Sequence, residues 1–253
     1  MSEITAPPFS SKQIITAAEK LTSDFYQSVG PAHLRLNGLR FEDVYEKIIY
    51  LQYGIEIVED EELGSDESGR MILGRFEVCA NTAFISRMLG RDLGDPRRTF
   101  TLWHEIGGHG VLQGEWLRNQ MQPPIIVTED SLSADTTLQL ERQANVFAAN
   151  AAAPGWFVEQ VVRYMIPGRE CFPFYAPCEY WLNVQGVQTH RYVADFWDLC
   201  QLIAREIGCY FGGLSAEALG YRLAKLGIVV DRSRRDLHLF RRSTEVTEVC
   251  CVA

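Results

Sequence analysis

The stretch Thr101-Leu-Trp-His-Glu-Ile-Gly-Gly-His-Gly110 organises the interpretation of the whole chain. Many zinc peptidases carry His-Glu-x-x-His on a helix, where one turn brings both His side chains to one face and the Glu acts as general base. Here three residues, not two, separate Glu105 from His109. In a regular helix, side chains four residues apart differ by about 40° around the axis and side chains five apart by about 140°. An undistorted helix therefore cannot aim both His104 and His109 at one metal ion.

Two alternatives follow from this spacing. Either the helix takes up one extra residue in a π-bulge, a feature common at functional sites, or His109 is not a ligand. Gly107 and Gly108 favour the bulge, because residues without a Cβ tolerate unusual backbone angles. They also weaken a helix by about 1 kcal/mol each relative to Ala. We therefore predict an expanded zinc helix in which His104 and His109 both bind, with loss of His109 from the site as the alternative.

A catalytic zinc site needs a third protein ligand and an open fourth position. Glu141 is the candidate, within Leu140-Glu-Arg-Gln-Ala-Asn-Val-Phe-Ala-Ala149, whose small residues permit close packing on the motif helix. Asn145 lies one turn later on the same face and could orient a ligand from behind. Glu105 would serve as general base. The residue that stabilises the oxyanion is left open among three candidates, which are Tyr175, His190 and Tyr192.

Composition restricts the class of protein. The 253 residues, 47% of them hydrophobic, suffice for one sizeable core, and no run of 18 apolar residues predicts a membrane span. The N-terminus lacks the features of a signal peptide, so we expect a cytoplasmic protein. The net charge of −9 argues against direct nucleic-acid binding, although Arg232–Arg242 is locally basic. Seven Cys without a C-x-x-C pair indicate reduced thiols rather than disulfides.

Apolar periodicity and capping residues predict a mostly helical chain. Residues 1–9 are expected to be disordered, and 167–188 and 114–135 irregular, the latter with a short strand at 125–127. Short strands are expected at 55–59, 71–81 and 228–230. The expected helices cover 11–29, 41–53, a segment starting at Asp95-Pro96, 134–152, 155–165, 192–207 and 215–226.

Both motifs resemble those of the ImmA/IrrE-type metallopeptidases, a gluzincin-like group. Phe100–His109 resembles their F-T-L-A-H-E-x-G-H segment, and Glu141–Ala149 followed by Pro154 resembles their E-x-x-A-N-x-F-A…P segment, whose Glu is the third metal ligand. Asn81, expected on the strand before the motif, also fits. Leu202–Ile228 resembles the helical C-terminal part of the family, so that the resemblance covers about residues 38–232.

The resemblance implies an α+β fold, namely a mostly helical zincin-like peptidase domain with a small antiparallel sheet and a C-terminal helical part. The implied organisation is an N-terminal helix or extension at 1–37, the peptidase domain at 38–168, the helical part at 169–232 and a basic tail at 233–253. The extra residue departs from the family pattern. It is similar to the H-E-x-x-G-H spacing of dipeptidyl peptidase III, in which both His bind zinc.

The function that the resemblance implies is zinc-dependent endopeptidase activity on a protein substrate, typically a helix-turn-helix repressor of stress-response genes. His104, His109 and Glu141 would hold zinc, although manganese or another divalent ion also suits this ligand set. One alternative is a non-catalytic regulator that binds or senses metal on a peptidase scaffold. A small-peptide hydrolase is the other, suggested only by the H-E-x-x-G-H spacing. The substrate, the activating signal and the oligomeric state do not follow from the residues.

Overall fold

The computed structural model describes residues 6–66, 68–90, 95–120 and 133–233. The strand expected at 125–127 and nearly all of the basic tail lie outside these ranges. The chain divides into two compact units. The first contains residues up to Pro154 together with Tyr210–Leu214, and the second contains Gly155–Cys209 and the residues from Ser215 onward. The sequence places a boundary after residue 168 instead, and the difference arises because α7 packs against α8 of the second unit.

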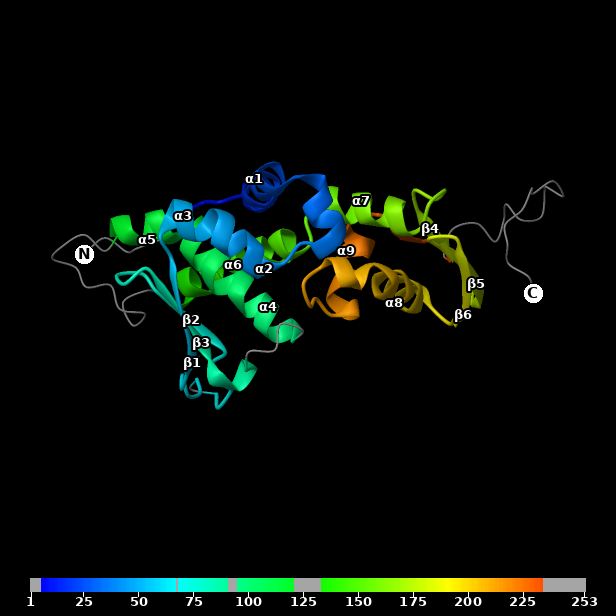
Figure 1. Ribbon diagram of the computed structural model, residues 1–253. Helices are drawn as coiled ribbons and strands as arrows, with labels where there is room; N and C mark the ends of the chain where they lie inside the picture. The colour runs from blue at the N-terminus through cyan, green and yellow to red at the C-terminus, as the bar shows by residue number, and fades with distance from the viewer. Residues whose placement is uncertain (1–5, 67, 91–94, 121–132, 234–253) are drawn as a thin grey trace. The chain divides into compact units, whose positions relative to one another are not determined.

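The first unit holds the N-terminal helices, a small sheet and the helices of the motif (Figure 1). Its elements are α1 (Ser11–Asn37), α2 (Phe41–Val44), η1 (Tyr45–Ile49), α3 (Tyr50–Tyr53), β1 (Glu56–Glu61), β2 (Gly74–Glu77), β3 (Thr82–Ser86), η2 (Arg87–Leu89), α4 (Pro96–Leu102), η3 (Trp103–Leu112), α5 (Gly114–Gln120) and α6 (Ala134–Ala152). The mostly helical α+β fold expected from the sequence is thus confirmed.

The sheet of the first unit is mixed rather than purely antiparallel. Its strand order is β1-β3-β2, in which β3 runs parallel to β1 and antiparallel to β2. The parallel pair requires the chain to return between β1 and β3, and β2 lies within that connection. Ala83 and Ile85 of β3 are fully buried, so the central strand supplies the apolar contacts of the sheet.

Residues 6–9 pack on the first unit, which corrects the expectation of disorder for them, whereas residues 1–5 lie outside the described residues. Ser10 caps α1 through a capping box with Gln13. Gly30 adopts φ 77°, so the expected break falls at Gly30-Pro31, but helical structure resumes and continues to Asn37. The sequence predicted that the helix ends at Gly30-Pro31, but Pro is also well suited to the first turn of a helix, and the second helical part begins there.

Close packing of α6 on the motif helix forms the centre of the first unit. Ala144, Ala148 and Ala151 of α6 are fully buried, and these short side chains let the two helix backbones approach each other. Phe147 fills the space beside them. The helix α6 begins after Ser133, whose side chain accepts a hydrogen bond from the Thr136 amide, and has the bounds expected from its Ala-rich sequence.

The second unit contains more β-structure than expected. Its elements are α7 (Gly155–Met165), β4 (Phe172–Phe174), β5 (Cys178–Val184), β6 (Val187–Val193), α8 (Phe196–Ile207), the start of η5 (Gly208–Tyr210), α9 (Ala216–Lys225) and β7 (Val229–Asp231). The segment expected to be irregular forms β4 and a hairpin of β5 and β6, and α8 begins at Phe196 rather than at 192. Ser215 caps α9 and Gly227 follows it at φ 70°, as expected.

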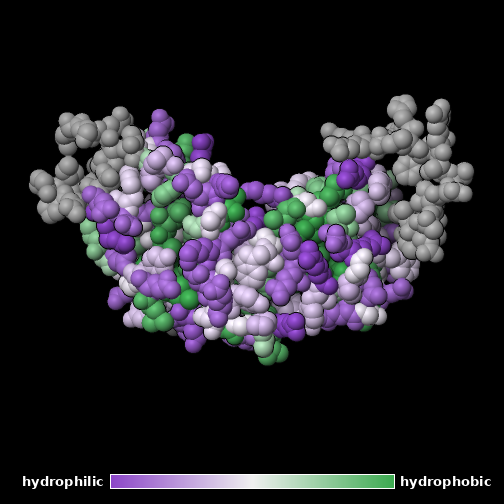
Figure 2. All heavy atoms as spheres, turned by 90° about the horizontal axis from the view of Figure 1, so that it is seen from above, coloured by the Kyte–Doolittle hydropathy of each residue, from purple (hydrophilic) through white to green (hydrophobic). Residues whose placement is uncertain are grey.

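The described surface mixes residue types. Figure 2 shows hydrophilic side chains over most of one face, with hydrophobic ones among them. Leu36 and Leu51 are among the most exposed large apolar residues, at 84% and 72%. Among the helices that the structure describes, none has the length and apolar character needed to cross a membrane.

Candidate metal centre

The motif helix is a π-helix over Trp103–Leu112. Its wider turn is seen at its end, where the Gln113 amide donates to the Gly108 carbonyl at 3.2 Å, five residues back. This winding returns side chains five residues apart to the same face, which an α-helix does not. The expected bulge is therefore present and is longer than a single turn, and His104 and His109 both face α6.

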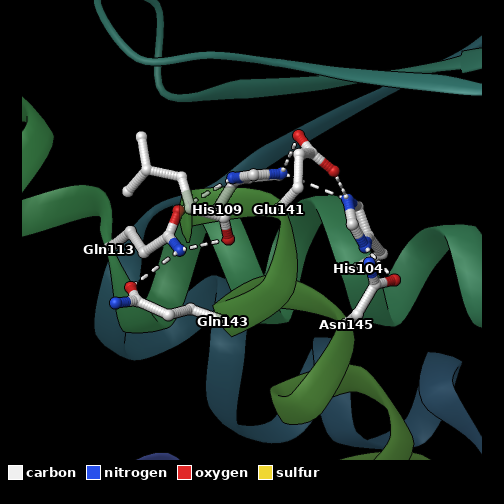
Figure 3. Close-up of polar contacts among 7 residues, drawn as sticks. His104, His109, Gln113, Glu141, Gln143 and Asn145 are labelled. Atoms are coloured by element: carbon white, nitrogen blue, oxygen red, sulfur yellow. Dashed lines mark hydrogen bonds and ion pairs between the residues drawn. The ribbon is translucent and has the colours of Figure 1, made fainter. Parts of the chain in front are cut away.

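Three side chains meet above this helix (Figure 3). His104 Nε2 lies 3.1 Å from His109 Nε2. Glu141, near the middle of α6, places Oε2 3.1 Å from His104 Nε2 and Oε1 3.3 Å from His109 Nε2. The structure thus brings together the three residues that the sequence proposed as ligands.

A side-chain amide oxygen contacts Nδ1 of each imidazole and so determines which ring nitrogen carries the hydrogen. His104 Nδ1 lies 3.2 Å from Asn145 Oδ1, and His109 Nδ1 lies 2.9 Å from Gln113 Oε1. An amide oxygen can only accept, so each Nδ1 donates, and in the neutral ring each Nε2 then carries a lone pair toward Glu141. Asn145 thus contacts His104, a candidate ligand, from behind the ring, and its part in orienting a ligand stays a prediction.

This donor set suits a metal ion. Two lone pairs and a carboxylate directed at one point repel each other unless a proton or a cation lies between them. The two Nε2 atoms lie 3.1 Å apart, close to the roughly 3.3 Å expected between two ligand atoms of a tetrahedral zinc ion. Each contacts a different oxygen of the Glu141 carboxylate, and with one oxygen counted for Glu141 the three ligand atoms lie within 4.8 Å of one another. His104, His109 and Glu141 could therefore hold a metal ion without rearrangement of the helices.

The electrostatics of the cluster couple its members. Burial by itself would lower the pKa of His109, but hydrogen bonding to Glu141 and the charge of Glu105 raise that pKa above its usual value. Burial would likewise raise the pKa of Glu141, whereas the two imidazoles lower it well below its usual range. Glu141 is consequently a carboxylate at neutral pH, which is the form that binds metal.

Glu105 lies beside this cluster and is largely buried. It follows His104 directly on η3, and its charge acts on His109. The edge strand β2 passes over it at Gly74. A Cβ added to Gly74 would lie 2.6 Å from Glu105 Cγ and 2.9 Å from Oε1, so only glycine leaves room for this carboxylate.

Gly107 and Gly108 were predicted to permit unusual backbone angles, but the structure shows a different role for them. Neither has a positive φ. A Cβ on Gly107 would lie 2.7 Å from Phe147 Cε1, and one on Gly108 would lie 2.5 Å from Ala144 Cβ. The pair is therefore needed for the close approach of α6, which brings Glu141 within reach of both imidazoles.

Asn81 is not on a strand. It lies in the turn between β2 and β3 at φ 52°, a conformation that Asn tolerates better than most residues. Its side-chain amide donates to the Tyr53 and Gly54 carbonyls at 2.9 and 2.8 Å, and its oxygen accepts from Arg118 at 2.9 Å. Its contacts therefore join α3, the turn and α5.

The three candidates for oxyanion stabilisation, Tyr175, His190 and Tyr192, belong to the second unit. Their assignment stays open. His190 stacks on Trp181 with ring centroids 4.5 Å apart, and Tyr192 is 63% exposed.

Sequence reasoning missed Gln113 and Gly74. Gln113 is fully buried and lies one turn after His109, the same separation that pointed to Asn145 after Glu141. Applying that spacing to His109 would have found it. Gly74 had no comparable signal, because its closeness to Glu105 depends on the path of β2.

Comparisons with known proteins leave the family open. No family model matches the chain, and no curated protein matches it. Among solved structures, a Mycobacterium tuberculosis transcriptional regulator is similar at 15% sequence identity with a TM-score of 0.41. The similarity covers 83% of this chain and 55% of the regulator, so this chain spans about half of that protein's length.

Proposed function

We propose that this chain is a zinc-dependent endopeptidase. The observation that carries the proposal is the convergence of His104 Nε2, His109 Nε2 and the Glu141 carboxylate beside Glu105. A three-ligand site with an adjacent carboxylate is the arrangement of catalytic rather than structural zinc. Zinc bound there would supply an activated water and polarise the scissile carbonyl.

The residues of the chain take distinct parts in this reaction. Glu105 accepts a proton from the attacking water and returns it to the leaving amine. Asn145 and Gln113 keep the imidazoles oriented, with each Nε2 lone pair aimed at one point. Gly74 keeps open the space that the Glu105 carboxylate occupies.

The proposed substrate is a protein, with a helix-turn-helix repressor as the specific class. This part rests on the resemblance of the two motifs to the ImmA/IrrE-type peptidases. The first substrate to test is any helix-turn-helix protein encoded by a neighbouring gene. It would be incubated with the purified protein, and the fragments identified by mass spectrometry.

The test of the site combines metal content with turnover. We expect about one zinc per chain, with binding strongly weakened in His104→Ala, His109→Ala and Glu141→Ala. Glu105→Gln should retain zinc and lose turnover by roughly 10²- to 10⁴-fold. Glu115→Gln, an exposed change on α5, is the matched control and should alter neither quantity.

Two outcomes would contradict the proposal. Undiminished zinc binding by His109→Ala would remove that residue from the site. Zinc binding without cleavage of any protein offered, in the wild-type chain, would favour the metal-binding regulator instead.

A further inference from the structure

A chain of amide hydrogen bonds leads from His109 to the N-terminal segment. His109 Nδ1 donates to Gln113 Oε1 at 2.9 Å. Gln113 Nε2 donates to the Leu140 carbonyl at 2.8 Å and to Gln143 Oε1 at 3.3 Å, as Figure 3 shows. Gln143 Nε2 donates to the Pro7 carbonyl at 2.7 Å. The last acceptor is 102 residues before His109 in the sequence.

The direction of every bond in this chain is fixed. The carbonyls of Leu140 and Pro7 can only accept, so they determine which end of each glutamine amide points toward them. Gln143 must turn its nitrogen to Pro7 and its oxygen to Gln113. Gln113 is then left with its oxygen toward His109, so a flipped amide would place two donors or two acceptors face to face.

The chain of amides is shielded from water. Gln113 is 0% exposed and Gln143 is 4% exposed. Breaking a bond at such a position leaves a buried polar group without a partner, which destabilises the arrangement. The orientation of the His109 ring is thus tied to the intact set of bonds rather than to one contact.

Apolar packing holds the N-terminal segment in place independently. Ala6 belongs to a buried cluster with Leu117 of α5 and Leu140 of α6, against which Val78 and Trp116 also pack. On the other side, the Ser10 capping box fixes the start of α1. Residues 6–9 are therefore anchored at both ends, with the Pro7 carbonyl between the anchors.

We propose that Gln113 and Gln143 are positioning residues for His109 and that residues 6–9 form part of the support of the metal centre. The hydrogen-bond relay, which runs from His109 through Gln113 and Gln143 to the Pro7 carbonyl, holds the His109 ring with Nδ1 protonated and Nε2 directed at Glu141. Its role in metal binding rests on the proposed function, whereas the relay itself exists without metal. Neither the motif nor its spacing assigns any part of the site to the N-terminus.

The first measurement needs no metal. In the metal-free protein, NMR should find the side-chain amide protons of Gln113 and Gln143 slow to exchange with solvent. Removal of residues 1–9 should speed the exchange of the Gln143 amide and shift the His109 ring signals. Removal of residues 1–5 is the matched control, because it leaves Ala6 and Pro7 in place, and should change neither.

The second measurement is zinc affinity by competition with a chelator. Gln113→Met keeps the length of the side chain and removes its hydrogen bonds, and should weaken zinc binding by about 10- to 100-fold. Gln143→Met and removal of residues 1–9 should weaken it less, by roughly tenfold or less, because each leaves the bond from His109 to Gln113 in place. Gln139→Met, at an exposed position of α6, is the control.

Each outcome decides the inference. Equal zinc affinity for the two truncations, with unchanged His109 signals, would overturn the role of the N-terminal segment. A Gln113→Met protein that melts earlier but binds zinc like the wild type would reduce Gln113 to a packing residue. Protected amides and the expected truncation shifts in a protein that binds no zinc would uphold the relay and reject the proposed function. Should Gln113→Met not fold, Gln143→Met and the truncation pair carry the test.

Discussion

At the scale of single residues, Gly74 shows how tightly Glu105, the proposed general base, is enclosed. Its missing Cβ would overlap both Glu105 and Thr101, with 2.6 Å to Thr101 Cγ2. Glu105 is itself largely buried, so it has little space into which to retreat. Its position is therefore set by the strand above it as well as by the helix that carries it.

Gly74→Ala should separate metal binding from turnover. The added methyl group displaces the Glu105 carboxylate, and a displacement of about 1 Å at a catalytic group can cost roughly 100-fold in rate. Zinc affinity should be nearly unchanged, because the added Cβ would meet Glu105 and Thr101 and none of the three candidate ligands. Gly208→Ala, whose Cβ would meet nothing within 4 Å, is the control for both assays. Turnover equal to the wild type would show that Gly74 does not set the position of the Glu105 carboxylate.

Proton competition at His109 predicts the pH dependence of metal binding. Zinc binds the neutral imidazole, and the pKa of His109 is raised by Glu141 and Glu105 against the opposing effect of burial. The proton therefore competes up to a higher pH than at an ordinary histidine. Below that pKa, affinity should fall by about tenfold per pH unit. Glu141 adds no loss there, because its pKa is lowered. Isothermal titration from about pH 8 to pH 5 checks this, and a flat affinity would contradict it.

At the scale of elements, the π-helix η3 and the helix α6 together bring His104, His109 and Glu141 to one point. The π winding turns His109 back to the face of His104, and the glycine pair lets α6 approach until Glu141 reaches both. The sequence predicted the winding because the i to i+5 spacing left few alternatives. It could not give the reason for the glycines, which depends on Ala144 and Phe147 of another helix.

Gly108→Ala should destabilise the protein although alanine favours helices. The gain in helix propensity is about 1 kcal/mol. The new Cβ would lie 2.5 Å from Ala144 Cβ and 2.6 Å from its Cα, and overpacking of this kind costs about 1–3 kcal/mol. Urea unfolding should therefore show a net loss, with weaker zinc binding because η3 and α6 move apart.

A second substitution tests that explanation. Ala144→Gly combined with Gly108→Ala removes the clashing Cβ but not the Cα, so stability and zinc affinity should return in part. Additive losses in the double variant would mean that the two positions do not contact each other.

At the scale of the whole molecule, the sequence predicted helices better than strands. Capping signals such as Ser10, Asp95-Pro96 and Ser215 act locally, and each begins a helix where expected. The hairpin of β5 and β6 was missed because its outer face carries Trp181 and Tyr192, so apolar and polar residues do not alternate clearly. Likewise, the parallel pairing of β1 with β3 joins Glu56 to Thr82 across the chain, and no local pattern reports such a register.

The division into two units makes a prediction about where zinc stabilises the chain. All three candidate ligands belong to the first unit. A ligand present at 100 times its Kd stabilises the folded state by about 2.7 kcal/mol, and this stabilisation spreads through the cooperative unit that binds it.

Hydrogen exchange with mass spectrometry should therefore show slower exchange in η3 and α6 when zinc is added. Exchange in α8 and α9, which pack on each other in the second unit, should stay the same. In the Glu141→Ala protein, zinc should no longer slow the exchange of η3 and α6. Equal protection of α8 and α6 would show that the two units unfold together, whatever their separate cores.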